Sequence, residues 1–119
     1  MLNPKNITIA IIGGGPAGLM AAEVIASQGL SVHVFDAMPT MARKFLRAGI
    51  GGLNITFDEP FDFFLNNYYD RSKNIEPLLR NFSPTDLIAW VNGLGIQTFI
   101  GSSHRIFPVE KKASPLLRA

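Results

Sequence analysis

The chain is short, lacks cysteine and carries little net charge. It has 119 residues, of which 47% are hydrophobic and 17% are charged. This length suits one domain, and the apolar fraction is typical of a folded chain rather than a disordered one. Because cysteine is absent, disulfide bonds, thiolate catalysis and cysteine-ligated metal centres are excluded. A net charge of +2 from scattered basic residues gives no indication of nucleic-acid binding.

The N-terminal region lacks the pattern of a membrane anchor or a secretion signal. The apolar run Ile9 to Ile12 stops at three glycines, far short of the ~20 residues that cross a bilayer. The glycines and Pro16 would also break the helical core of a signal peptide that begins near Lys5. The sequence therefore predicts a cytoplasmic protein without membrane contact, which agrees with the absence of cysteine.

The first part of the chain has the pattern of a β-α-β unit. Residues 7–12 (ITIAII) are β-branched and almost wholly apolar, which is typical of a strand buried on both faces. A glycine-rich turn at 13–18 leads into a helix predicted over 17–28. Residues 31–35 (SVHVF) predict a second strand. We expect the two strands to be parallel and joined by a right-handed crossover, as in an α/β Rossmann-like fold.

The following residues predict short helices in an irregular region. Residues 38–58 have no regular period, and we expect a short helix followed by an extended loop. The aromatic-rich segment 60–69 predicts a helix packed on a core, and the apolar spacing within 75–82 predicts another. Ser83 and Pro84 are typical of an N-cap and a first helical position, so a further helix begins there.

The C-terminal part predicts a β-hairpin and the start of one more helix. Residues 97–107 contain two short apolar runs around Gly101-Ser102-Ser103. Ser114 and Pro115 begin a helix close to the end of the sequence. We therefore expect residues 1–119 to be the N-terminal part of a larger domain.

The glycine-rich turn matches the dinucleotide-binding pattern G-x-G-x-x-G. Gly13 permits the sharp turn, Gly15 lets the backbone approach a pyrophosphate, and Gly18 lets helix and strand pack closely. The helix N-terminus supplies N–H groups and a positive dipole end for the phosphates. Asp36, at the end of the second strand, would accept hydrogen bonds from ribose hydroxyls and repel a 2′-phosphate, which argues against NADP. No Gly-Lys-Ser/Thr follows the turn, so a P-loop is excluded.

A second group of residues suits the rest of a dinucleotide. Arg43 or Lys44 could neutralise a pyrophosphate, while Gly49, Gly51 and Gly52 could let the backbone approach a flat ring. The alternative is a flexible, solvated loop. Paired carboxylates, a Ser-His-Asp order and metal-ligand spacing do not stand out in the sequence, so no catalytic residue is assigned.

Four blocks in the same order give the chain a family resemblance. They read IIGGGPAGLMAAEVIA, MARKFLRAGIGGLNIT, LIAWVNGLGIQTFIGSSHRIFP and KKASPLLRA. Together they resemble the N-terminal part of bacterial BaiN-like flavoproteins, also described as aminoacetone-oxidase-like FAD-binding proteins. The resemblance covers essentially the whole chain. It implies FAD as the cofactor of an oxidoreductase that acts on a small molecule, with a substrate or NAD(P)H as electron donor.

The resemblance also implies which residues bind the cofactor and where the chain departs from the family. Ala42 replaces a glycine of the broader family, Ile50 interrupts its glycine run, and Leu53 stands where a cysteine is expected. Chemistry that uses a cysteine beside the flavin is therefore not carried over. The cofactor-binding residues implied are Gly13, Gly15, Pro16, Ala17, Gly18, Asp36, Arg43, Lys44, Gly49, Gly51, Gly52 and Asn54.

Three functions agree with these observations. The first is the FAD-binding part of a flavin-dependent oxidoreductase, whose longer relatives supply the rest of the sheet and a substrate-facing domain. The second is a truncated, non-catalytic dinucleotide-binding module, and the third is an NAD-dependent oxidoreductase. Because two strands leave a parallel sheet open, we expect the chain either to self-associate or to need the missing C-terminal portion or a partner.

Overall fold

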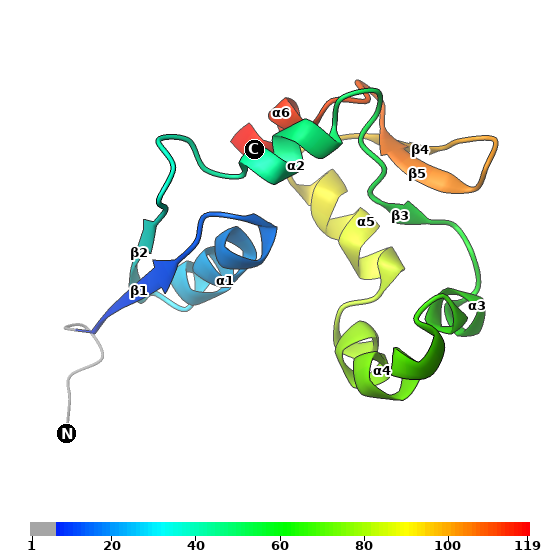
Figure 1. Cartoon of the computed structure of the whole chain (residues 1–119), viewed down its shortest axis with the longest axis horizontal. Helices are drawn as coiled ribbons and strands as arrows, with labels where there is room; N and C mark the ends of the chain where they lie inside the picture. Colours follow the sequence, from blue (N-terminus) through cyan, green and yellow to red (C-terminus); the bar gives the residue numbers. More distant parts are fainter. Residues whose placement is uncertain (1–6) are drawn as a thin grey trace. The chain divides into compact units, whose positions relative to one another are not determined.

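The computed structural model describes residues 7–119 of the chain (Figure 1). It forms two compact units, which comprise Met1–Arg47 (unit 1) and Ala48–Ala119 (unit 2). Lys5, near which a signal peptide would begin, lies outside the described residues. In the part that the structure describes, no helix has the length and apolar character needed to span a membrane.

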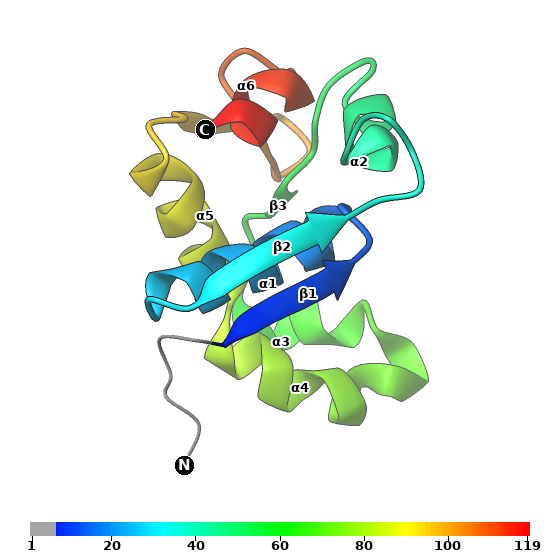
Figure 2. The same ribbon diagram turned by 90° about the vertical axis from the view of Figure 1, so that its left-hand side faces the viewer.

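Unit 1 is the β-α-β unit that the sequence predicts. It contains strand β1 (Thr8–Ile12), helix α1 (Pro16–Ser27) and strand β2 (Ser31–Phe35). The strands pair in parallel, in a register that runs from Thr8 opposite Ser31 to Ile12 opposite Phe35. Figure 2 shows β1 and β2 side by side, pointing in the same direction, with α1 behind them. The fold class predicted from the sequence is therefore confirmed.

The expectation that the first strand is buried on both faces is wrong for this chain. Ile11 faces α1, since its Cγ2 atom lies 3.3 Å from the position that a Cβ on Gly18 would take. On the opposite face, Ile12 is 84% exposed and its neighbour Phe35 is 55% exposed. The physical reason is that unit 1 supplies one helix for a sheet with two faces. One face therefore carries apolar side chains in contact with solvent.

Unit 2 is built around a three-stranded antiparallel sheet of β3 (Thr56–Phe57), β4 (Thr98–Ile100) and β5 (Arg105–Pro108), in the order β3-β5-β4. The predicted hairpin is confirmed, but the two-residue strand β3, which pairs with β5, lies in the segment expected to be a loop. Helix α5 (Pro84–Gly93) packs against β3 and β4. The remaining helices, beginning with the one at the boundary of the units, are α2 (Arg43–Ala48), α3 (Phe61–Asn66), η2 (Tyr69–Arg71), α4 (Ser72–Asn81) and α6 (Ala113–Arg118).

Helix α5 begins where its sequence predicts. Ser83 is the N-cap, and its Oγ accepts a hydrogen bond from the Asp86 N–H at 3.2 Å. In return, the Ser83 N–H donates to Asp86 Oδ2 at 2.8 Å, which completes a capping box. The hydroxyl of Ser83 also donates to this carboxylate, and these bonds lower the pKa of Asp86 below its ordinary value. The capping box therefore fixes the start of α5 at Ser83.

The aromatic segment 60–69 is not the packed core that its composition suggests. Phe63 is 66% exposed and Tyr69 is 84% exposed, and α3 contains no buried residue. This segment breaks into a six-residue helix and a 3-10 turn, so Phe63 and Tyr69 face away from the contacting rings of Phe64 and Tyr68. The buried side chains of unit 2 come from other elements: Leu53, Thr56, Val91, Ile106, Pro108 and Ala113.

Candidate functional site

The glycine-rich turn connects β1 to α1 and is attached to the end of β2. The Gly13 N–H donates to the Phe35 carbonyl oxygen at 2.7 Å. Gly13 has a φ of +105°, a conformation that side chains other than glycine rarely adopt. The turn therefore leaves the carboxyl edge of the two parallel strands, which is where α/β sheets bind their ligands.

Gly18 has the packing role that the pattern predicts. A Cβ atom at this position would overlap the carbonyl oxygen of Gly13 and would lie 3.3 Å from Ile11 Cγ2. The first turn of α1 thus lies directly against the end of β1. Because there is no room for a methyl group, Gly18 sets how closely the helix N-terminus approaches the turn.

Gly15 differs from Gly18 because its surroundings are open. No atom of the described chain lies within 4 Å of the position that a Cβ on Gly15 would take. Its φ of −82° and ψ of −179° are ordinary for an N-cap residue, so backbone strain does not account for the glycine. The open space lies at the N-terminus of α1, where Pro16 occupies the first turn. The Ala17 and Gly18 N–H groups lack an intrahelical acceptor there, as first-turn amides do. This geometry fits an anion such as a phosphate.

The carboxylate of Asp36 accepts hydrogen bonds from the backbone of the glycine turn and from the backbone that follows β2. Its Oδ2 accepts a hydrogen bond from the Gly14 N–H at 2.8 Å, and its Oδ1 accepts one from the Met38 N–H at 2.8 Å. The bond from Met38, the bond from Gly14 and the positive charge of Arg43 lower the pKa of Asp36 below its ordinary value of 3.8. The carboxylate is therefore ionised at neutral pH. Its stabilising effect is lost only as the pH falls through this lowered pKa.

The carbonyl group of Gly14 is held by Ala42, a contact that the sequence did not predict. The Ala42 N–H donates to the Gly14 carbonyl oxygen at 2.7 Å. Ala42 adopts a φ of +54°, which is unfavourable for a residue with a side chain. This conformation gives a physical reason for the glycine that the broader family has at this position. Asp36 and Ala42 thus hold the two peptide groups on either side of the Gly14 Cα atom.

The basic pair lies in α2, immediately after Ala42. Arg43 and Lys44 are both exposed and begin this helix. Arg43 is near enough to Asp36 to influence the pKa of its carboxylate. The structure therefore brings the glycine turn, Asp36 and Arg43 together within unit 1.

The second glycine group belongs to unit 2 and includes a residue with a packing role. A Cβ atom on Gly49 would lie 2.6 Å from the Cβ of Ala113, so this glycine lets the chain pass against the start of α6. Gly51 and Gly52 have φ values of +92° and +124°, which glycine adopts without strain. Asn54 follows them and is exposed. Within the described residues, no cluster of three His, Cys, Asp or Glu side chains could hold a metal ion.

Comparison with known proteins identifies the family. Residues 7–119 match the family described as the HI0933-like protein Rossmann domain. The chain belongs to this family. The match confirms the resemblance to BaiN-like and aminoacetone-oxidase-like FAD-binding proteins.

Three curated relatives show the kind of protein in which this domain occurs. A stretch covering 48% of the chain is 40% identical to UacF of Escherichia coli (strain K12), a candidate oxidoreductase, and covers 7% of that protein. The thiamine thiazole synthase of Pyrobaculum aerophilum is 36% identical over 71% of the chain and 33% of its own length. The small chain of the NADPH glutamate synthase of Azospirillum brasilense is 40% identical over 42% of the chain and 10% of its own length. The chain thus carries a Rossmann dinucleotide-binding domain of the oxidoreductase type and spans a third or less of each relative.

Proposed function

We propose that this chain binds the adenosine diphosphate part of FAD and forms the N-terminal part of the cofactor site of a flavin-dependent oxidoreductase. The observation that carries the proposal is the open space at Gly15, over the first turn of α1 and beside the ionised Asp36. Family membership supports FAD rather than a mononucleotide. The non-catalytic module and the NAD-dependent enzyme are the alternatives that the test below separates.

The residues of unit 1 would each act on one part of the dinucleotide. The Ala17 and Gly18 N–H groups would donate to the pyrophosphate, helped by the α1 dipole and the charges of Arg43 and Lys44. Asp36 donates nothing, but each carboxylate oxygen keeps a further lone pair for a ribose hydroxyl. Its negative charge would disfavour a ribose 2′-phosphate.

Unit 2, taken by itself, offers residues that suit a flat ring such as a flavin. Gly51 and Gly52 have no side chain to obstruct a flat ring, and Asn54 offers a carboxamide donor and acceptor. When bound, the isoalloxazine would supply the redox chemistry, while the protein supplies binding and orientation. The reducing substrate would be a small molecule or NAD(P)H.

Replacement of Asp36 by alanine is expected to weaken binding of FAD and of ADP by about tenfold to a hundredfold. This range corresponds to the loss of hydrogen bonds to a charged acceptor, about 1–3 kcal/mol. Free FMN lacks the adenosine and should bind the wild-type chain poorly and the variant equally poorly. Calorimetric titration of both chains with FAD, ADP and FMN measures these differences, and a visible spectrum of the purified protein reports any flavin that it retains.

A matched control separates the role of this carboxylate from a general effect of charge. Asp70 is an exposed acid in η2, in the other unit, so Asp70→Ala should leave all three affinities unchanged. Circular dichroism of Asp36→Ala checks that unit 1 remains folded without the Gly14 and Met38 bonds. FMN binding as tightly as FAD would contradict the proposal. NAD binding more tightly than FAD would favour the NAD-dependent enzyme.

We also propose that the face of the β1–β2 sheet opposite α1 requires cover from a second copy or from further polypeptide. Ile12 and Phe35 are paired neighbours on this face and are both exposed. Exposed apolar pairs of this kind favour association. The isolated chain should therefore form concentration-dependent oligomers in sedimentation velocity. Ile12→Thr keeps a β-branched residue in the strand and should reduce the association. Ile50→Thr, at an exposed isoleucine in unit 2, should not. A monodisperse wild-type monomer would refute this proposal.

A further inference from the structure

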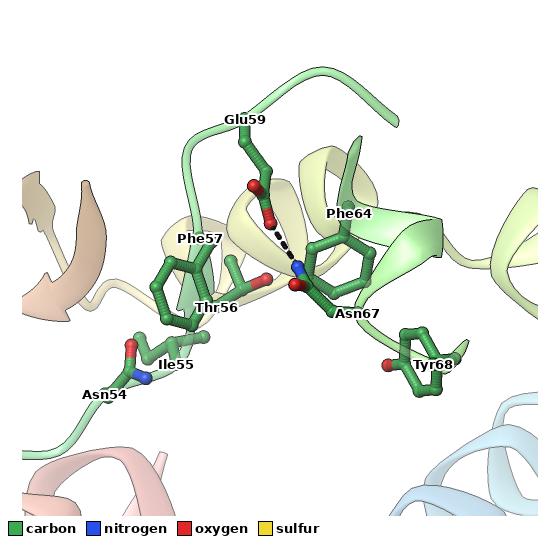
Figure 3. A pocket seen from close by; sticks show the side chains of 8 residues that line it. All are labelled: Asn54, Ile55, Thr56, Phe57, Glu59, Phe64, Asn67 and Tyr68. Carbon is green, nitrogen blue, oxygen red and sulfur yellow. Dashed lines mark hydrogen bonds between the residues drawn. The ribbon is translucent and has the colours of Figure 1, made fainter. Parts of the chain in front are cut away.

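Unit 2 contains a hollow that is lined by residues of this unit alone. Its volume is about 410 Å³, within the range of small-molecule sites. The side chains that line it come from the segment between Asn54 and Tyr68, which includes β3 and α3. Figure 3 shows all eight of them: Asn54, Ile55, Thr56, Phe57, Glu59, Phe64, Asn67 and Tyr68.

Aromatic rings form much of the wall of this pocket. Phe57 and Phe64 lie on either side of the pocket in Figure 3. The Tyr68 ring packs edge to face on the Phe64 ring, with 5.9 Å between the two ring centres. The strand that carries Phe57 is anchored, because the adjacent Thr56 is buried and pairs with Ile106 of β5. Aromatic rings of this kind favour a flat apolar ligand that packs on them.

Glu59 and Asn67 place two hydrogen-bond acceptors on the polar edge of the pocket. Glu59 Oε1 accepts a hydrogen bond from Asn67 Nδ2 at 2.8 Å (Figure 3). This bond turns the amide of Asn67 so that its Oδ1 remains available, and the second carboxylate oxygen of Glu59 is also available. Glu59 is the charged residue of the lining. Arg105 does not line the pocket, although its guanidinium lies 5.4 Å from the centre of the Phe57 ring.

We propose that this pocket binds a small aromatic molecule that carries N–H donors on one edge. The rings select a flat body of one or two fused rings, and the acceptors of Glu59 and Asn67 select the donors. An anionic ligand would be repelled by the negative charge of Glu59, the charged residue of the lining. Two sources share this chemistry, namely a neutral amino-substituted heterocycle and an aromatic ring with a protonated amine. The pocket shares Asn54 with the proposed flavin end of the FAD site, but Glu59, Asn67 and the aromatic rings that carry this proposal have no part in the proposed function.

Amide chemical-shift titration of the ¹⁵N-labelled full chain tests the proposal without FAD. The probes are 2-aminopyrimidine as the neutral donor, benzylamine as the cation, pyrimidine as the ring without donors, and benzoate as the anion. We expect saturable shifts at residues 54–68 with 2-aminopyrimidine or benzylamine, and none with benzoate or pyrimidine. If benzylamine binds more tightly, the amine source is favoured. Tighter binding of 2-aminopyrimidine favours the neutral heterocycle.

Two variants locate the interaction. Glu59→Gln should weaken the binding of benzylamine by about tenfold, the loss expected for a charged hydrogen bond. It should weaken the binding of 2-aminopyrimidine by less. Asp62→Asn removes a carboxylate of α3 that does not line the pocket and should change neither affinity. Equal binding of benzoate, shifts confined to other residues, or no saturable shift with either donor probe would overturn the proposal.

Discussion

Replacement of Gly18 by alanine is expected to destabilise unit 1 by about 3 kcal/mol or more, at the upper end of the cost of overpacking. The added methyl group would overlap the carbonyl oxygen of Gly13, which is backbone and cannot rotate aside. To relieve the overlap, the first turn of α1 would have to move away from β1. Such movement would also disturb the Gly13 bond to Phe35, which attaches the turn to β2. Chemical denaturation of the two chains, followed by far-UV circular dichroism, measures the difference.

The control for this variant is a glycine in a helix with free space around it. Gly93 ends α5, and no atom lies within 4 Å of the position of its added Cβ. Gly93→Ala should therefore be neutral or stabilising by about 0.5–1 kcal/mol, as for alanine in place of glycine in an unstrained helix. If Gly18→Ala behaves like Gly93→Ala, the close packing of α1 on β1 is refuted.

The elements of unit 1 could be predicted because several local signals agree. The apolar run of β1, the glycines, the helix start at Pro16 and the β-branched residues of β2 all favour one β-α-β unit. In α5, the Ser83 and Asp86 capping box is likewise local, since its two residues are three positions apart. Signals of this kind need no knowledge of the rest of the chain.

The contacts and the short strand that the sequence did not predict depend on residues that are distant along the chain. The bond between Asp36 and Gly14 joins two strand ends, and the contact of Gly49 with Ala113 joins a loop to the last helix. Neither spacing has a local signature. Strand β3 has two residues, too few for an alternating pattern, and it exists because β5 offers a partner.

Asp36 has a structural role in addition to the one that its sequence position predicts. Its type and its position after a strand predicted a ribose contact. The structure shows that this carboxylate also accepts a hydrogen bond from the Gly14 N–H, while the Ala42 N–H donates to the Gly14 carbonyl oxygen. A variant at position 36 therefore alters both the turn and any ribose contact. A test of phosphate binding alone needs a residue whose side chain position touches nothing else in the chain.

Gly15 is that residue, and Gly15→Val is expected to weaken binding of FAD and ADP by about a hundredfold or more. The valine side chain would occupy the open space at the start of α1 and keep the phosphates from the Ala17 and Gly18 N–H groups. Losing two hydrogen bonds to a charged group, each about 1.5–3 kcal/mol, gives this loss of affinity. Calorimetric titration with ADP measures it without interference from the flavin ring.

The fold of the Gly15→Val chain should survive, which distinguishes it from Gly18→Ala. The φ of −82° and ψ of −179° at Gly15 suit an L-residue, and a Cβ there meets no atom within 4 Å. Its stability without ligand should fall by no more than about 1 kcal/mol, the cost of a poor N-cap residue. Unchanged ADP affinity would contradict phosphate binding at this turn. A large loss of stability without ligand would instead show that Gly15 is needed for packing. The expected pattern is that Gly15→Val loses affinity and Gly18→Ala loses stability, because one glycine leaves space for a ligand and the other leaves space for the backbone.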